Sequence, residues 1–148
     1  MTQIPIADDL FTWPDEAPKL IAGRGSDGSL VFPYRPRRLI NGVVEELDMV
    51  ELPRRGRLWT FTSQVFRPPS PPYAGDDSAE TFVPFTVGYV ELEGALRVEA
   101  RLTEPDPERL HIGQEMELVV VPFNTDREGN VKMTYAFAPV EGENHDHR

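Results

Sequence analysis

Two neighbouring segments whose side chains alternate in character constrain the fold of this chain more than any other feature. Residues 85–92 (FTVGYVEL) alternate between two faces rich in aromatic and β-branched side chains, and residues 96–102 (LRVEARL) alternate apolar with charged side chains. A period of two is typical of β-strands, and the second segment is typical of a strand with one buried and one solvated face. With a turn at residues 93–95 between them, the two segments predict the central antiparallel hairpin of a small barrel.

Three further segments predict the other strands of that barrel, namely residues 58–66, 115–123 and 131–138. The side chains expected to face inward are Trp59, Phe61 and Val65 in the first segment, Met116, Leu118 and Val120 in the second, and Val131, Met133, Tyr135 and Phe137 in the third. Residues 105–110 predict one helical turn between the third and fourth strands. Five strands in this order are typical of the OB-fold, a five-stranded Greek-key barrel.

Composition supports a mainly β protein with one core. The 148 residues suffice for a single ordinary core with a small appendage, and 15 prolines with 11 glycines favour short strands and turns over helices. We expect an N-terminal arm over residues 1–19, a small two-turn module over 20–56, the barrel over 57–140 and a disordered tail over 141–148.

The N-terminal arm carries two aromatic residues, Phe11 and Trp13. A helix of one or two turns fits before Pro14, whereas the prolines exclude a longer one. Either the two aromatic side chains pack on the chain's own core, or a helical arm uses them as anchors on a partner protein.

The module over residues 20–56 contains two turn signals. Two apolar runs flank Gly25–Gly28, which predicts a hairpin, and a second turn is expected at Asn41–Gly42. The following residues 43–52 show no single period and predict an extended segment. The module has too little apolar bulk to fold alone.

The charge distribution argues against several kinds of partner. The formal net charge is −10, and after Gly56 sixteen acidic residues face eight basic ones, so the barrel should repel nucleic acid. Without cysteines the chain can form neither a disulfide nor a thiolate metal site. No apolar run approaches the length of a membrane span and no signal-peptide pattern opens the sequence. We therefore expect a cytoplasmic protein with no membrane partner.

The sequence contains no recognisable set of catalytic residues. Of the three histidines, His111 is expected in a surface loop, and His145 and His147 fall in the tail. The glycines at 23, 25 and 28 match a dinucleotide-loop spacing, but a strand rather than a helix is predicted after them. No other fingerprint of a hydrolase, kinase or metalloenzyme occurs.

Six arginines concentrate in or beside the two-turn module: Arg35, Arg37, Arg38, Arg54, Arg55 and Arg57. Either they form a solvated face paired with nearby acidic residues such as Glu45 and Glu51, or they form a site for an anion. The forked guanidinium group suits both phosphate and a partner's carboxylates.

Five segments in order resemble a family of bacterial and archaeal acyl-CoA-associated proteins long known as domain-of-unknown-function family 35. They are residues 20–24 (LIAGR), 32–33 (FP), 56–62 (GRLWTFT), 84–92 (PFTVGYVEL) and 112–116 (IGQEM). The resemblance implies a rubredoxin-like zinc ribbon followed by an OB-fold. Relatives carry four zinc-binding cysteines, whose matching positions here are Gly25, Gly28, Leu39 and Gly42, so we expect a ribbon without zinc.

The resemblance also implies a function. Such proteins are non-catalytic partners of thiolase-fold enzymes, which are thiolases, acyltransferases or aldolases acting on CoA thioesters. We therefore expect a hetero-oligomer with a thiolase-fold catalytic subunit, a coenzyme A thioester as possible ligand and no covalently bound cofactor. The expected contacts with CoA phosphates are Arg54, Arg55 and Arg57, and the expected partner interface comprises Phe11, Trp13, Arg35, Arg37, Arg38 and Tyr73, with the proline-rich loop 67–73 beside it.

Two alternatives remain open. One is an autonomous OB-fold module that binds nucleic acid or an oligosaccharide, as this fold often does. The other is an accessory subunit of a CoA-thioester hydratase. The identity of the partner would separate the second alternative from the thiolase hypothesis.

Overall fold

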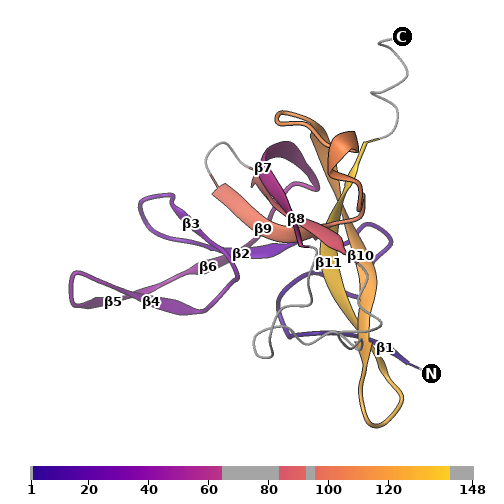
Figure 1. The fold of residues 1–148 in the computed structure, drawn as a ribbon. Helices are drawn as coiled ribbons and strands as arrows, with labels where there is room; N and C mark the ends of the chain where they lie inside the picture. The colour runs from indigo at the N-terminus through magenta and orange to yellow at the C-terminus, as the bar shows by residue number, and fades with distance from the viewer. Residues whose placement is uncertain (1, 65–83, 93–95, 141–148) are drawn as a thin grey trace.

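The computed structural model describes residues 2–64, 84–92 and 96–140, and almost all its regular structure is β (Figure 1). The strands are β1 (Gln3–Pro5), β2 (Ile21–Arg24), β3 (Leu30–Val31), β4 (Arg37–Ile40), β5 (Val43–Glu46), β6 (Asp48–Glu51), β7 (Arg55–Gln64), β8 (Phe85–Leu92), β9 (Leu96–Leu102), β10 (Glu115–Thr125) and β11 (Val131–Pro139). Within the described ranges the one helical element is the 3-10 turn η1 (Pro107–Arg109), where a helical turn was predicted.

Strands β7 to β11 form a closed barrel. The sheet runs β11-β10-β7-β8-β9, and a parallel pairing of β11 with β9, Ala136 opposite Arg101 and Phe137 opposite Leu102, joins its two ends. Closure at Ala136 and Phe137 removes the free sheet edges there, whereas residues 131–133 of β11 keep an edge that β9 does not cover. The predicted five-stranded OB-fold barrel is confirmed.

The predicted central hairpin is confirmed as β8 and β9. In β8 one face is buried, formed by Thr86, Gly88, Val90 and Leu92, and it lies opposite the buried residues of β9. Gly88 permits a close approach to β7, because a Cβ atom there would lie 2.7 Å from the carbonyl oxygen of Thr60. The absence of a side chain at this position therefore sets how tightly the two strands pack.

The core fills the barrel and continues beneath the two-turn module. Its most deeply buried large side chains include Phe137, Met116 and Leu118, as the alternation of β10 and β11 predicted. Leu20 and Leu52 from the module belong to the same cluster. The module therefore shares part of the barrel's core.

The predicted inward orientation of Trp59 is wrong. Leu58 is the buried residue of this part of β7, whereas Trp59 is 44% exposed. The pairing of β7 with β8 shifts register between Leu58 and Thr60, which marks a β-bulge at Trp59. The extra residue turns the indole ring outward, while Phe61 beyond the bulge packs partly against the core. Val65, predicted to share their face, lies outside the described residues.

The predicted helical character of the N-terminal arm is also wrong. Residues 3–5 form β1, which pairs in parallel with the start of β11, and Phe11 forms a bridge with Leu20. The amide of Ile6 donates to the carbonyl oxygen of Met133. The edge of β11 thus supplies hydrogen-bond partners that a short helix interrupted by prolines could not match.

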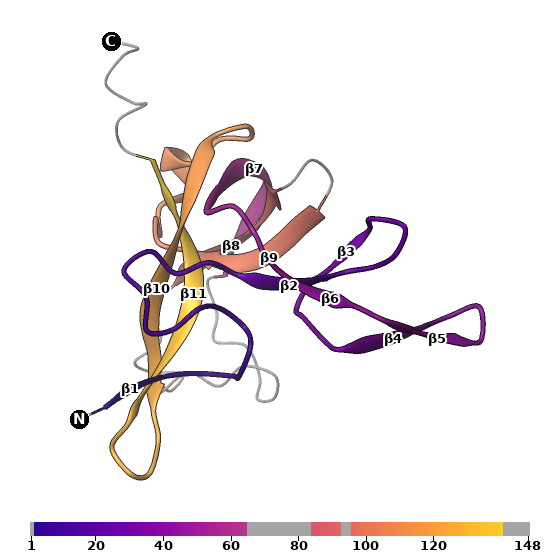
Figure 2. The same ribbon diagram turned by 180° about the vertical axis from the view of Figure 1, so that it is seen from behind.

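The two-turn module projects from the side of the barrel (Figures 1 and 2). Strands β3, β2 and β6 form a small sheet, and β4 with β5 forms a separate two-stranded hairpin at the end farthest from the barrel. Between β5 and β6, Leu47 is buried and donates its amide to the carbonyl oxygen of Pro36. This interruption explains why residues 43–52 show no single period.

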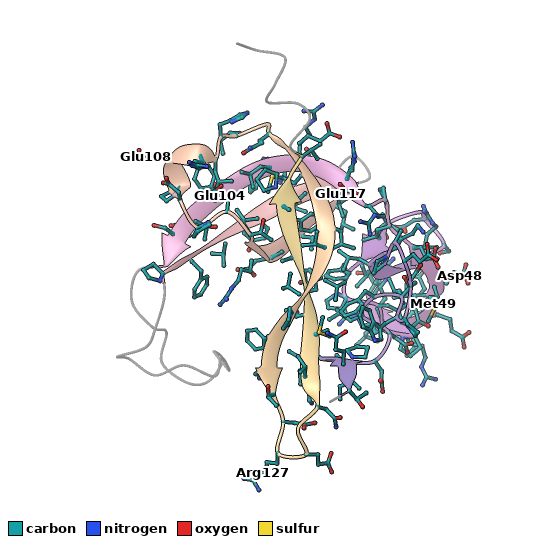
Figure 3. All side chains as sticks on the ribbon, turned by 90° about the vertical axis from the view of Figure 1, so that its right-hand side faces the viewer. Asp48, Met49, Glu104, Glu108, Glu117 and Arg127 are labelled. Atoms are coloured by element: carbon teal, nitrogen blue, oxygen red, sulfur yellow. The ribbon has the colours of Figure 1, made fainter. Side chains whose placement is uncertain are left out.

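A second hairpin, formed by β10 and β11, extends past the barrel at the end opposite η1. Figure 3 shows Arg127 at its tip, away from Glu104 and Glu108 at the η1 end. Its turn is held by Asp126, whose carboxylate accepts hydrogen bonds from the backbone amides of Glu128 and Asn130. The turn between the two predicted strands therefore lies at residues 126–130.

Candidate partner interface

The β4–β5 hairpin is built by its turn. Asn41 and Gly42 both adopt positive φ angles, of 52° and 78°, which a two-residue type I′ turn requires and which asparagine and glycine tolerate best. The register places Leu39 opposite Val44 and Ile40 opposite Val43. Because directly opposed residues share a face and neighbours alternate, the two pairs point to opposite faces of the hairpin.

Both faces of this hairpin expose apolar side chains. Leu39 and Val44 are 69% and 63% exposed on one face, and Ile40 and Val43 are 38% and 65% exposed on the other. Met49 on β6 adds another exposed apolar side chain to the module, as Figure 3 shows. Scattered exposed apolar residues are common on protein surfaces, but a contiguous group is typical of an interaction site.

A polar network fixes the hairpin to the turn between β2 and β3. The guanidinium group of Arg38 bonds to Glu45 Oε1 at 2.8 Å and to Ser29 Oγ at 2.9 Å, and lies 3.5 Å from Asp27. Glu45 Oε2 in turn accepts bonds from the amide and the hydroxyl of Ser26, at 2.8 and 2.6 Å. Arg38 and Glu45 thereby join the β4–β5 hairpin to the turn between β2 and β3, which is distant in sequence.

The network keeps its carboxylates charged. The hydroxyl and amide of Ser26, followed by Arg38, lower the pKa of Glu45 from its ordinary value of 4.5 to about 2. Hydrogen bonds from the hydroxyl and amide of Ser29 lower the pKa of Asp27 as well. Both groups are therefore ionised at neutral pH, and the attachment of the hairpin is electrostatic in part.

The four positions expected from the family resemblance to match zinc ligands carry no donor side chain. Gly28 and Gly42 lie in turns with positive φ, and Leu39 is exposed on β4. At Gly25 a Cβ atom would collide with Nη2 of Arg38, so the space beside this glycine holds a guanidinium group. Among the described residues, no cluster of three histidine, cysteine, aspartate or glutamate side chains could bind a metal ion. These residues do not fit a zinc ion.

Arg54 makes hydrogen bonds and an ion pair within the chain. Its guanidinium group donates to the carbonyl oxygens of Pro18 and Leu118 and lies 3.3 Å from Glu117. It therefore ties the N-terminal arm to β10. Nη1 and Nη2 of Arg54 already have partners within the chain, and its contact with a CoA phosphate stays a prediction.

Arg55 and Arg57 follow Arg54 in sequence, lie on β7 and are more exposed than Arg54. Arg55 is 55% exposed and pairs with Glu115 at 3.3 Å and Glu117 at 3.6 Å, while Arg57 donates to the carbonyl oxygen of Gly113. Arg55 and Arg57, two of the arginines expected to contact CoA phosphates, thus lie on β7 beside acidic side chains and a carbonyl group of the same chain. Their binding of CoA phosphates stays a prediction.

The residues predicted at the partner interface divide into four groups. Phe11 is buried in the core and packs edge to face against the half-buried Trp13, so intramolecular packing explains this pair and Phe11 is not available as a surface anchor. Arg38 is only 13% exposed and serves the network. Arg35 and Arg37 are exposed at the hairpin, and Tyr73 with the rest of loop 67–73 lies outside the described residues.

The exposed apolar residues of the hairpin were not predicted from the sequence, where Leu39 was considered only as a position matching a zinc ligand. The signal that could have found them is the apolar pair on each side of Asn41–Gly42, because adjacent apolar residues must point to opposite faces of a strand. Such a pattern on a two-stranded hairpin leaves at least one apolar face without a covering layer.

A second exposed cluster lies on the outer face of the barrel. Trp59 and Tyr89 pack edge to face with ring centroids 6.2 Å apart, and the guanidinium carbon of Arg97 lies 3.9 Å from the indole centroid. Beside them, Phe61, Gly88 and Glu99 line a small hollow. His111, which the sequence left as a surface residue, is exposed in the loop after η1.

The fold defines the general class of this protein. It is an OB-fold protein whose closed barrel carries a projecting module of two hairpins. The family model for the C-terminal OB-fold domain of ChsH2 matches residues 49–121. A "DUF35 domain-containing scaffold protein" of Pyrococcus furiosus is 31% identical over 82% of this chain and 84% of its own. The chain belongs to the DUF35 family.

Other similar proteins carry related names. The "benzoylsuccinyl-CoA thiolase subunit BbsA" of Thauera aromatica is 30% identical over 65% of this chain and 59% of its own. A "DUF35 domain-containing scaffold protein" of Methanothermobacter thermautotrophicus is 29% identical over 74% of this chain and 76% of its own. A solved structure described as the "Ltp2-ChsH2(DUF35) aldolase" has the same fold, with a TM-score of 0.56 and 22% identity over 82% of this chain and 84% of that one.

No helix in the described ranges is long and apolar enough to cross a membrane.

Proposed function

We propose that this protein is a non-catalytic accessory subunit of a thiolase-fold enzyme that acts on CoA thioesters. The observation that carries the proposal is the 31% identity to a scaffold protein over most of both chains, joined by the likeness to a thiolase subunit. The exposed apolar hairpin supports it, since a scaffold must offer a surface to another polypeptide. In this proposal the catalytic nucleophile belongs to the partner.

The proposal extends to acyl-CoA as a ligand of the complex. Arg55, whose side chain is 55% exposed on β7, can reach a phosphate from solvent. Its pairing with Glu115 and Glu117 lowers its attraction for an anion, so we expect it to assist a site formed mainly by the partner.

Recovery of the partner from the native host tests the proposal. The tagged full-length chain is expressed at its natural level, and co-purifying proteins are identified and assayed for thiolysis or aldol cleavage of CoA thioesters. We expect a thiolase-fold enzyme in fixed stoichiometry with the chain. Recovery of the chain alone, or with a hydratase of the hot-dog fold, would overturn the proposal and, in the second case, favour the hydratase alternative.

A second candidate function is an autonomous OB-fold binding module, and the Trp59–Tyr89–Arg97 cluster favours it. Exposed aromatic rings beside an arginine on an OB barrel are typical of sites that stack planar groups such as nucleobases. The net charge of −10 opposes binding of a polyphosphate chain. Titration of single-stranded DNA at several salt concentrations separates the two functions, because a nucleic-acid site must weaken steeply as salt rises.

A further inference from the structure

The β4–β5 hairpin is unusual in exposing apolar side chains on both of its faces. Leu39 and Val44 form a cross-strand pair on one face, and Ile40 and Val43 form a pair on the other. A hairpin that packs on a flat surface needs only one apolar face. Two apolar faces suit an element that is enclosed on both sides.

Contacts within the chain fix the conformation of the hairpin before any partner binds. It pairs with no other strand among the described residues, so its outer edges are unpaired there, and a two-stranded hairpin is at best marginally stable in water. The network of Arg38, Glu45 and Ser26 fixes it to the neighbouring turn. Such preorganisation lowers the entropic cost of binding.

Charge identifies the chemistry of the surface that receives the hairpin. Residues 37–46 contain two arginines and two glutamates, so this segment is formally neutral in a chain whose net charge is −10. Arg38 and Glu45 neutralise each other at 2.8 Å, and Arg37 is paired in register with Glu46. A neutral apolar tip on an acidic protein matches an apolar cleft better than a basic surface.

We propose that the β4–β5 hairpin inserts as a wedge into an apolar cleft of the catalytic partner, with Leu39 and Val44 against one wall and Val43 against the other. This inference rests on the proposed function for the identity of the partner, and it assigns the surface through which the subunit is held. A standard interface takes about 20–30 residues from each side, which is more than the hairpin contains. We therefore place the hairpin at the centre of the interface, with other residues of the chain around it.

Substitutions on the two faces test the wedge. Val43→Asp and Val44→Asp each place a charge on a different face of the hairpin, and both side chains are exposed in the free chain, so folding should persist. Ile112→Asp is the matched control, because Ile112 is 60% exposed in the loop after η1. Affinity is measured by titrating each full-length variant with the thiolase-fold enzyme recovered with the wild-type chain.

We expect both hairpin variants to weaken binding at least ~10-fold, as loss of a central apolar contact does, and Ile112→Asp to bind like wild type. Binding of the wild type should change little between low and high salt, because burial of neutral apolar groups is not screened. Loss in only one hairpin variant would contradict enclosure on both faces, and equal binding by all variants would overturn the interface while the proposed function stood.

Hydrogen exchange of the wild-type chain gives an independent reading should a variant fail to fold. The amides of both β4 and β5 should exchange more slowly when the thiolase-fold enzyme is added. Unchanged exchange in these strands within a complex would overturn the inference. A wild-type chain that binds no thiolase-fold enzyme would overturn the proposed function itself and remove the basis of the wedge.

Discussion

At the scale of single residues, Arg38 decides how the projecting module is held together. Its guanidinium group reaches Glu45, Ser29 and Asp27, and glycine at position 25 leaves the space that it fills. Exposed ion pairs usually contribute little, but this arginine is mostly buried and its partners are themselves hydrogen-bonded. A polar network thus joins the β4–β5 hairpin to the turn between β2 and β3.

Replacement of Arg38 by methionine should loosen the β4–β5 hairpin without affecting the barrel. The change removes the cation and leaves Glu45 with only Ser26 as a partner. Hydrogen exchange followed by mass spectrometry should show amides 37–46 exchanging about 10-fold faster, with barrel amides unchanged. Arg37→Met is the control, because Arg37 is exposed on the same strand. Equal exchange in the two variants would contradict the role of Arg38.

Acid should loosen the same hairpin through Glu45. Because hydrogen bonds and Arg38 depress its folded-state pKa from 4.5 to about 2, the carboxylate stabilises the folded module fully above pH 4.5. That contribution is lost as the pH falls from 4.5 through 2. Protection factors of the hairpin amides should decline over this window, and by less in Glu45→Gln. Protection that stays constant from pH 6 to 2 in the wild-type chain would refute this account.

At the scale of elements, the strands whose side chains alternate regularly could be predicted and the irregular ones could not. Residues 96–102 carry their orientation in the sequence, because only one of their faces is apolar. Residues 85–92 have two apolar faces, so their strand could be predicted but not which face is buried. The outward turn of Trp59 depends on a bulge in the pairing with β8, and the extended arm depends on the free edge of β11. Both are set by partner strands that no local pattern encodes.

Gly88 shows how closely β7 and β8 pack, and Gly88→Ala should destabilise the barrel. The added methyl group would meet the carbonyl oxygen of Thr60 at 2.7 Å and Leu58 at 3.1 Å, so the strands must separate. Overpacking of this kind costs about 1–3 kcal/mol in the free energy of unfolding. Urea denaturation measures it, with Ser63→Ala as a control expected to cost about 0.5 kcal/mol or less. If Gly88→Ala and Ser63→Ala had the same free energy of unfolding, the close packing of β7 on β8 at Gly88 would be contradicted.

At the scale of the whole molecule, the barrel is a closed core and the module is an exposed surface attached to it (Figure 2). The sequence could predict the barrel, since its alternating strands and its helical turn follow the order of an OB-fold. It could not predict the apolar hairpin as a surface, because exposure depends on which elements lie nearby. The arginine cluster was predicted from proximity in sequence, whereas the structure directs Arg38 and Arg54 to intramolecular partners.

The division of labour between this chain and a partner is tested most directly by reconstitution. The thiolase-fold enzyme purified with the chain is assayed on its CoA thioester alone, with the chain added, and with the chain present but no enzyme. The account predicts no turnover by the chain alone and activity that rises, with a saturating dependence on the added chain, when the two are combined. Turnover by the isolated chain, or enzyme activity indifferent to its presence, would contradict it.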